Sequence, residues 1–336
     1  MSEGGDLNAN NLSEFSHQDI ENFFNTPYVI LTYTLCYGIA VWTVVMHSLI
    51  LVCFVINRRA SWMQKTKGIL SLVLTDLGSG IGFMFLVFAQ THIKVNLYAC
   101  TIPLGNYMTT QLATNLQVLR ICVQRCIAVL SSTQRQAEGT LLTVVQFIII
   151  YLLSFAVNAI CLKWITVKPV YVVCNLQTLV EDNLQAICIF MLIVLSVPTF
   201  ASTTIYFIII QVLRRKSRAV APVLAVTTHS ATGSNDGSSS DTRPSDQRTT
   251  AVKKYMSKAL TTIGLVLLLN NFALFPFFLT LTYHVFYPGN VASIYIWFGS
   301  ALALQTNSAL SPFVYCLRVK ALNKAFKAMI TCKVKT

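Results

Sequence analysis

The chain has 336 residues, of which 54% are hydrophobic and 11% are charged, and its mean hydropathy is +0.61. A soluble domain usually carries a charge on about a quarter of its residues, so this composition excludes an ordinary soluble protein and indicates a chain that lies in lipid. The net charge of +13 would suit a nucleic-acid-binding protein, but the basic residues lie mostly at the ends of apolar runs and in the segments between them. That placement is typical of a membrane protein and argues against a nucleic-acid partner.

Apolar runs of about 18 residues or more follow one another along the chain. They lie near residues 29–57, 68–92, 97–130, 140–163, 184–214, 253–286 and 291–317. Each is long enough to cross a hydrocarbon core of about 30 Å as a helix, which satisfies its own backbone hydrogen bonds there. The sequence therefore predicts an all-α membrane protein, a seven-transmembrane helix bundle.

The distribution of Lys and Arg predicts which way this bundle faces. If the N-terminus is outside, all 25 Lys and Arg residues except Lys94, Lys163 and Lys168 fall on the inner side. The positive-inside rule thus predicts a multi-pass protein of the plasma membrane with an extracellular N-terminus. The polar tail of residues 1–27 then lies outside, and Asn11, in the triplet Asn-Leu-Ser, is a predicted glycosylation site.

The composition predicts the structure of two segments on the inner side of the membrane. Within a membrane-embedded domain of residues 28–317, about 216–252 should be a disordered loop, because this stretch is rich in Ser, Thr, Gly and Asp. Its hydroxyl residues are either kinase targets or part of a plain solvated linker. Residues 318–336 should form a short amphipathic helix and a tail, with the basic face on anionic membrane lipids. Cys332 is a predicted palmitoylation site.

Polar residues and prolines inside the apolar runs need a reason, because both are costly in a transmembrane helix. Asp76 is the only acidic residue in the middle of a run. It is either a hydrogen-bonded structural residue or a site that binds a cation or a proton. Pro198, Pro276 and Pro312 each interrupt a run and predict kinks, which often serve as hinges in membranes.

Several of these residues occur in an order that is known from other membrane proteins. The run from Asn307 to Tyr315 reads Asn-Ser-Ala-Leu-Ser-Pro-Phe-Val-Tyr, Arg125 follows Cys100 by 25 residues, and Asp76 ends the run Ser-Leu-Val-Leu-Thr-Asp. In these features the chain resembles the rhodopsin-like (class A) G-protein-coupled receptors along its membrane-embedded length. The resemblance implies a receptor for a small extracellular ligand that activates a heterotrimeric G protein.

The resemblance also assigns roles by position. Activation would involve residues of the third, fifth, sixth and seventh spans: Arg125, Tyr206, Pro276, Pro312 and Tyr315. The ligand pocket would be lined by mostly neutral or apolar residues, for which ordinary helix packing is the alternative: Tyr107, Gln111, Phe277, Phe278, Leu281, Ala301 and Gln305. A disulfide between Cys100 and Cys174 is implied, with Cys161 as a competitor. A sodium ion would be held by Asp76, Thr114, Asn307, Ser308 and Ser311; the alternative is water around a neutral Asp76.

The chain departs from the family pattern at several positions. Gln124 and Cys126 replace the Asp and Tyr that flank the Arg, Leu274 replaces a Trp, and His47 replaces an Asn. These departures leave open whether the receptor has raised basal activity or no longer signals. The segment from Pro312 to Lys320 resembles the end of the seventh helix in odorant receptors, which favours a chemosensory ligand.

Patterns typical of enzymes are missing. There is no phosphate-binding loop, no His-Glu-x-x-His pattern and no Gly-x-Ser-x-Gly elbow, so we expect neither catalysis nor a cofactor other than sodium. A seven-helix transporter or channel that uses Asp76 for cation or proton coupling remains the alternative to a receptor.

Overall fold

A computed structural model describes most of the chain. The residues that it describes are 27–57, 67–91, 97–130, 140–163, 183–229, 244–287 and 292–331. These residues form helices and no strand: α2 (Pro27–Ile56), α4 (Lys67–Thr91), α5 (Leu97–Leu130), α6 (Thr140–Lys163), α8 (Leu184–His229), α9 (Pro244–Phe286), α10 (Ala292–Arg318) and α11 (Lys320–Ile330).

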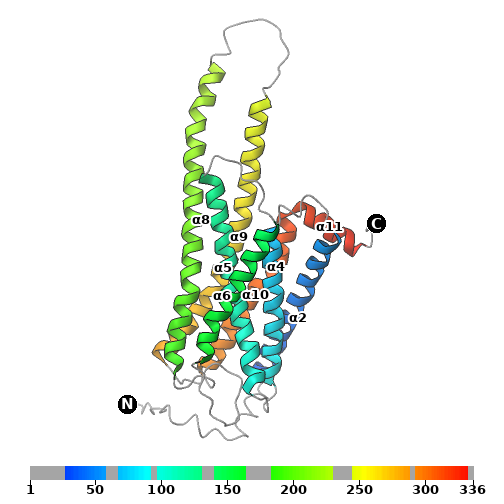
Figure 1. Cartoon of the computed structure of the whole chain (residues 1–336), viewed down its shortest axis with the longest axis vertical. Coiled ribbons are helices and arrows are strands. Elements are labelled where there is room, and N and C mark those ends of the chain that lie inside the picture. Colours follow the sequence, from blue (N-terminus) through cyan, green and yellow to red (C-terminus); the bar gives the residue numbers. More distant parts are fainter. Residues whose placement is uncertain are drawn as a thin grey trace.

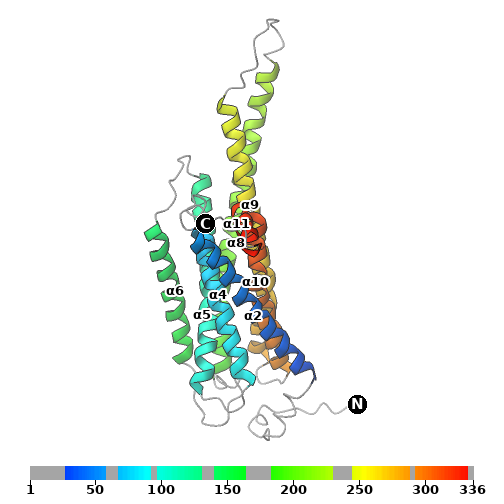
Figure 2. The same ribbon diagram turned by 90° about the vertical axis from the view of Figure 1, so that its right-hand side faces the viewer.

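The seven long helices run along one axis, and the short helix α11 lies across one end of the bundle (Figures 1 and 2). We refer to this end as the α11 end and to the opposite end as the far end. The predicted all-α bundle with a short C-terminal helix is confirmed. In α11, Leu322 is fully buried and Phe326 partly buried against the bundle, whereas Lys324 and Lys327 are exposed, as expected for an amphipathic helix.

The outer surface of the bundle is apolar. Leu141 on α6, Phe200 on α8 and Phe272 on α9 are 78%, 68% and 79% exposed, and many large apolar neighbours are exposed with them. A surface this apolar must lie against lipid. Of the described helices, α2, α4, α6, α8 and α9 are long and apolar enough to cross a membrane on their own. The helices α5 and α10 are long enough but more polar, and many of their polar side chains point into the bundle.

The interior consists of two apolar clusters with a polar layer between them. The far-end cluster includes Tyr107, Leu274, Phe277, Trp297 and Leu304. The α11-end cluster includes Ile50, Leu72, Val118, Leu267 and Tyr315. The polar layer is formed by buried side chains that lie between the two clusters along each helix: Thr43, His47, Thr75, Asp76, Ser79, Gln111, Asn115, Asn270, Gln305, Ser308 and Ser311. A buried layer of this kind requires that its members hydrogen-bond to one another.

Two helices extend far beyond the bundle. With 46 residues, α8 is about 69 Å long, and it projects next to α9 past the α11 end (Figure 1). Helical structure therefore reaches into both ends of the segment 216–252 that the sequence predicts to be disordered. The physical reason is composition: Ser, Gly and Asp, which disfavour helix, are concentrated in 230–243, outside the described residues. At the other side of that gap, Pro244 occupies the first helical position, where proline is well tolerated.

The close packing of α4 on α5 depends on Gly82. A Cβ atom at Gly82 would lie 2.6 Å from Nδ2 of Asn106 and 3.2 Å from the backbone nitrogen of Tyr107. We therefore expect Gly82→Ala to lower the free energy of unfolding by about 1–3 kcal/mol, because backbone atoms of α5 cannot move aside cheaply.

The matched control for this prediction is Gly38→Ala on α2, where an added Cβ meets nothing within 4 Å. That variant should be neutral or more stable by up to about 1 kcal/mol, since alanine favours helix. Thermal unfolding of both variants in detergent measures the difference. Equal melting temperatures for the two variants would contradict the assigned α4–α5 contact.

Candidate functional site

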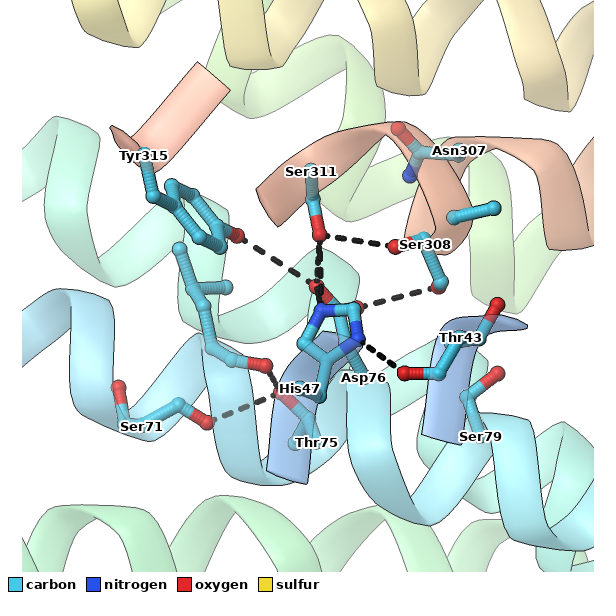
Figure 3. A network of polar contacts seen from close by, with 12 residues as sticks. Thr43, His47, Ser71, Thr75, Asp76, Ser79, Asn307, Ser308, Ser311 and Tyr315 are labelled. Atoms are coloured by element: carbon cyan, nitrogen blue, oxygen red, sulfur yellow. Dashed lines mark hydrogen bonds and ion pairs between the residues drawn. The ribbon is translucent and has the colours of Figure 1, made fainter. Parts of the chain in front are cut away.

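Asp76 on α4 is the centre of the polar layer and is 2% exposed. Its carboxylate accepts hydrogen bonds from three hydroxyl groups of α10: Ser308 to Oδ1 at 3.1 Å, and Ser311 and Tyr315 to Oδ2 at 2.7 and 3.4 Å (Figure 3). The Ser311 hydroxyl is also 3.0 Å from the carbonyl oxygen of Ser308. Pro312 has no N–H to offer that carbonyl, so the serine partly replaces a bond that the proline removes.

His47 on α2 lies against the same carboxylate. Its Nε2 is 3.4 Å from Oδ2 of Asp76 and 3.1 Å from Oγ of Ser311, and its Nδ1 is 2.8 Å from the carbonyl oxygen of Thr43 (Figure 3). A carbonyl only accepts, so Nδ1 carries a proton. If Nε2 also carries a proton, it donates to Oγ of Ser311, and the Ser311 hydroxyl in turn donates to Asp76. In that arrangement both ring nitrogens of His47 have a hydrogen-bond acceptor. The pair is then a buried imidazolium and carboxylate.

The predicted sodium ligands are only partly assembled around Asp76. Ser308 and Ser311 touch the carboxylate, but the amide of Asn307 donates to Oδ1 of Asn270 instead, at 3.2 Å. The buried Thr114 hydroxyl has no hydrogen-bond partner among the described residues. The ring of His47 stands beside Oδ2, where a cation would lie. These side chains therefore fit a sodium ion poorly and fit an internal ion pair well.

A second chain of polar contacts crosses the layer through four helices. The Gln111 amide of α5 donates to Ser79 of α4 at 2.8 Å, and the Ser79 hydroxyl donates to Oε1 of Gln305 on α10 at 3.1 Å. The Gln305 amide in turn donates to Oγ1 of Thr43 on α2 at 3.4 Å. Two of the predicted ligand-binding residues, Gln111 and Gln305, are therefore engaged in holding helices together.

The other predicted pocket residues meet in or against the far-end cluster. Tyr107, Phe277, Leu281 and Ala301 are each no more than 5% exposed, and Phe278 is partly buried. The Tyr107 hydroxyl is 3.4 Å from the carbonyl oxygen of Ala301, which joins α5 to α10. These side chains pack against one another, and their contact with a ligand stays a prediction.

An open groove of about 360 Å³ lies between α9 and α10 on the outer surface of the bundle, where its lining residues Leu279 and Ile296 are 54% and 39% exposed. It is lined by Pro276, Leu279, Thr280, Tyr283, Ile296, Gly299 and Ser300. Three of these residues are sequence neighbours of the predicted pocket residues Phe277, Leu281 and Ala301.

Of the predicted activation residues, Arg125, Tyr206, Pro312 and Tyr315 lie in or near the α11-end half of the bundle, whereas Pro276 lies at the far-end cluster. Tyr315 reaches Asp76, as described above, and the hydroxyl end of Tyr206 on α8 lies against Gly264 of α9, with its Cζ 2.7 Å from where a Cβ would be. Arg125 on α5 is partly buried. Across the described parts of the chain no acidic partner of Arg125 is found.

A family model matches most of the chain. The model is that of the seven-transmembrane receptors of the rhodopsin family, and it covers residues 48–315. The chain belongs to the rhodopsin family. A search of curated proteins finds no match.

In this rhodopsin-family receptor, several predicted modification sites lie outside the described residues. These are Asn11, Cys174 and Cys332, and the side chain of Cys100 in the first turn of α5 is also outside them. The disulfide, glycosylation and lipidation predictions therefore stay predictions. Among the described cysteines, Cys36, Cys53, Cys122 and Cys188 are buried in the spans and form no disulfide with a described residue.

Sequence reasoning missed part of the receptor's polar layer. His47 was recognised only as a departure from the family pattern, and Asn115, Asn270 and Ser79 were not singled out. Each lies inside an apolar run, and a polar residue at membrane depth is itself a signal of an interhelical contact. The pair Asn270-Asn271, flanked on both sides by apolar residues, is the clearest of these signals.

Proposed function

We propose that this receptor binds a small neutral or hydrophobic molecule on the outer side of the plasma membrane and activates a heterotrimeric G protein on the inner side. We infer the ligand class from the side chains that are buried in the far-end half of the bundle. Its described buried side chains are aromatic, aliphatic or neutral polar, with His284 as the one imidazole among them, and no described Asp, Glu, Lys or Arg is buried there. Among the described residues, a charged ligand would find no buried counter-ion there.

The orientation follows from the exposed basic residues. Arg214 and Arg215 on α8 and Lys320, Lys324 and Lys327 on α11 are exposed at the α11 end. By the positive-inside rule this end faces the cytoplasm, and the basic face of α11 suits anionic lipid. The far end, with the predicted ligand residues, then faces outward.

The signal would pass through α9. Ligand contact near Phe277 and Leu281 would favour a state in which α9 turns about Pro276 and its cytoplasmic half moves away from α5 and α8. Arg125, Tyr206 and Tyr315 would then rearrange and form the G-protein surface. The transporter alternative gains no support, because Asp76 is buried between two apolar clusters with no described polar path to either end.

The resemblance of the α10 end to odorant receptors makes volatile and other neutral small molecules the first ligand class to test. The experiment is a screen of such compounds on cells that express the receptor, with dissociation of the heterotrimer as the readout. An identical response from cells that lack the receptor would reject the proposal.

Two substitutions at the cytoplasmic end of α5 test the coupling step. Arg125→Ala should abolish coupling. Gln124→Glu should lower ligand-free signalling at equal surface expression, because a carboxylate next to Arg125 would pair with it in the resting state. Unchanged or higher basal signalling in Gln124→Glu would show that the absence of an ion pair at Arg125 does not set the basal signal.

A further inference from the structure

Three asparagines on different helices form a continuous hydrogen-bonded bridge. Asn270 of α9 donates to Oδ1 of Asn115 on α5 at 2.8 Å, and Asn307 of α10 donates to Oδ1 of Asn270 at 3.2 Å. Asn115 is itself fixed, because its amide donates to the backbone carbonyl of Gln111 at 3.1 Å. We call Asn115, Asn270 and Asn307 the asparagine bridge.

The next residue of α9 adds a third attachment. Asn271 donates to the hydroxyl of Thr203 on α8 at 3.1 Å. Two consecutive side chains therefore tie one level of α9 to α5, α8 and α10. That level is six residues, or about 9 Å, from Pro276 on the cytoplasmic side. Any turn of α9 about Pro276 that moves its cytoplasmic half outward must stretch or break these contacts.

The bridge lies where an electrostatic restraint is missing. Arg125 has no acidic partner among the described residues, and its neighbour Gln124 is neutral. Asn115 and Asn270 are 2% and 4% exposed, so their amides are shielded from bulk solvent. The position and the burial of the bridge therefore suit a restraint on the movement of α9.

We propose that the asparagine bridge holds α9 in the resting position of this receptor, in place of an ion pair at Arg125. The three asparagines are positioning residues: they touch neither ligand nor G protein and set the equilibrium between two placements of α9. This inference rests on the proposed function, since it assigns a resting state to a signalling receptor.

The test compares the loss of one amide of the bridge with the loss of an asparagine amide that joins no two helices. Asn270→Ala should shift the equilibrium toward the outward placement of α9 about three- to tenfold, the range expected for losing interhelical hydrogen bonds in a membrane. Asn158→Ala on α6 is the matched control. Asn158 is equally buried, at 4%, but among the described residues its amide bonds only to the carbonyl of Ser154 in its own helix.

Two readouts are needed. The first is the distance between labels introduced as non-natural amino acids at Leu130 on α5 and Thr261 on α9, both exposed near the cytoplasmic end, in purified receptor. The second is ligand-free dissociation of the G protein per receptor at the cell surface. Asn270→Ala should lengthen the distance and raise the signal, and Asn158→Ala should change neither. The double variant Asn115→Ala/Asn270→Ala should behave like Asn270→Ala, since the shared contact is already lost.

The outcomes separate the two proposals. An unchanged label distance in Asn270→Ala overturns the bridge. A longer distance without any G-protein signal supports the bridge and rejects the proposed coupling. If Asn270→Ala does not reach the surface, Asn270→Ser serves instead: its hydroxyl can bond to its own helix but is too short to span the bridge.

Discussion

His47→Leu is expected to lower the free energy of unfolding by about 3–5 kcal/mol, the usual cost of leaving a buried charge without its partner. The reason is the position of Asp76: its carboxylate is 2% exposed, and Nε2 of His47, 3.4 Å from Oδ2, is the group placed to compensate a charge there. The second variant, His47→Leu/Asp76→Asn, removes both charges and should recover most of the loss. Thermal unfolding followed with a thiol-reactive dye measures this, because the buried thiols Cys36, Cys53, Cys122 and Cys188 react only on unfolding.

The same variants decide the role of sodium. If the imidazole replaces the cation, the melting temperature of the wild type should be the same in sodium and in a large organic cation at equal ionic strength. His47→Asn, which removes the ring and leaves the oxygens of Asp76, Ser308 and Ser311, should then gain stabilisation by sodium. Stabilisation of the wild type by sodium would restore the predicted ion site. Equal melting of His47→Leu and the double variant would show that the pair is not charged.

Gly264→Ala is expected to raise ligand-free signalling about fivefold or more. An added Cβ would overlap the hydroxyl of Tyr206 and lie 2.7 Å from its Cζ, so the end of this side chain must shift away from α9. Overpacking of this kind costs about 1–3 kcal/mol, and the cost falls on the resting state alone if α8 and α9 separate on activation. Basal dissociation of the G protein per surface receptor is the measurement.

Gly299→Ala on α10 is the control for this variant, because a Cβ there meets nothing within 4 Å. Its basal signal should equal that of the wild type. A second arm, Gly264→Ala/Tyr206→Ala, restores the missing space and should return the melting temperature to that of Tyr206→Ala alone. A basal signal in Gly264→Ala no higher than in Gly299→Ala would show that the contact persists in the active state.

The spans and the short final helix were predictable because apolar length and amphipathic spacing are local properties of the sequence. The ends of α8 and α9 were harder to predict, since their extensions beyond the membrane are too polar to stand out from a loop. Asp76 could be identified as the centre of the site because an acid at membrane depth is rare. Its partners could not all be identified. Ser308 and Ser311 lie within hydrogen-bonding distance, as predicted, but the approach of His47 depends on how α2 packs against α4 and α10.

The polar content of α5 and α10 has a consequence for how the chain enters the membrane. An isolated helix inserts when the transfer of its side chains into lipid is favourable, and α5 and α10 carry amides and hydroxyls that would be left without partners there. Their neighbours supply those partners: α4 through Ser79, and α9 through Asn270. Insertion of α5 and α10 should therefore depend on helices made before them, with α4 retained next to the translocation channel until α5 arrives. Fragments that end after α5 should insert, whereas α5 expressed without α4 should not.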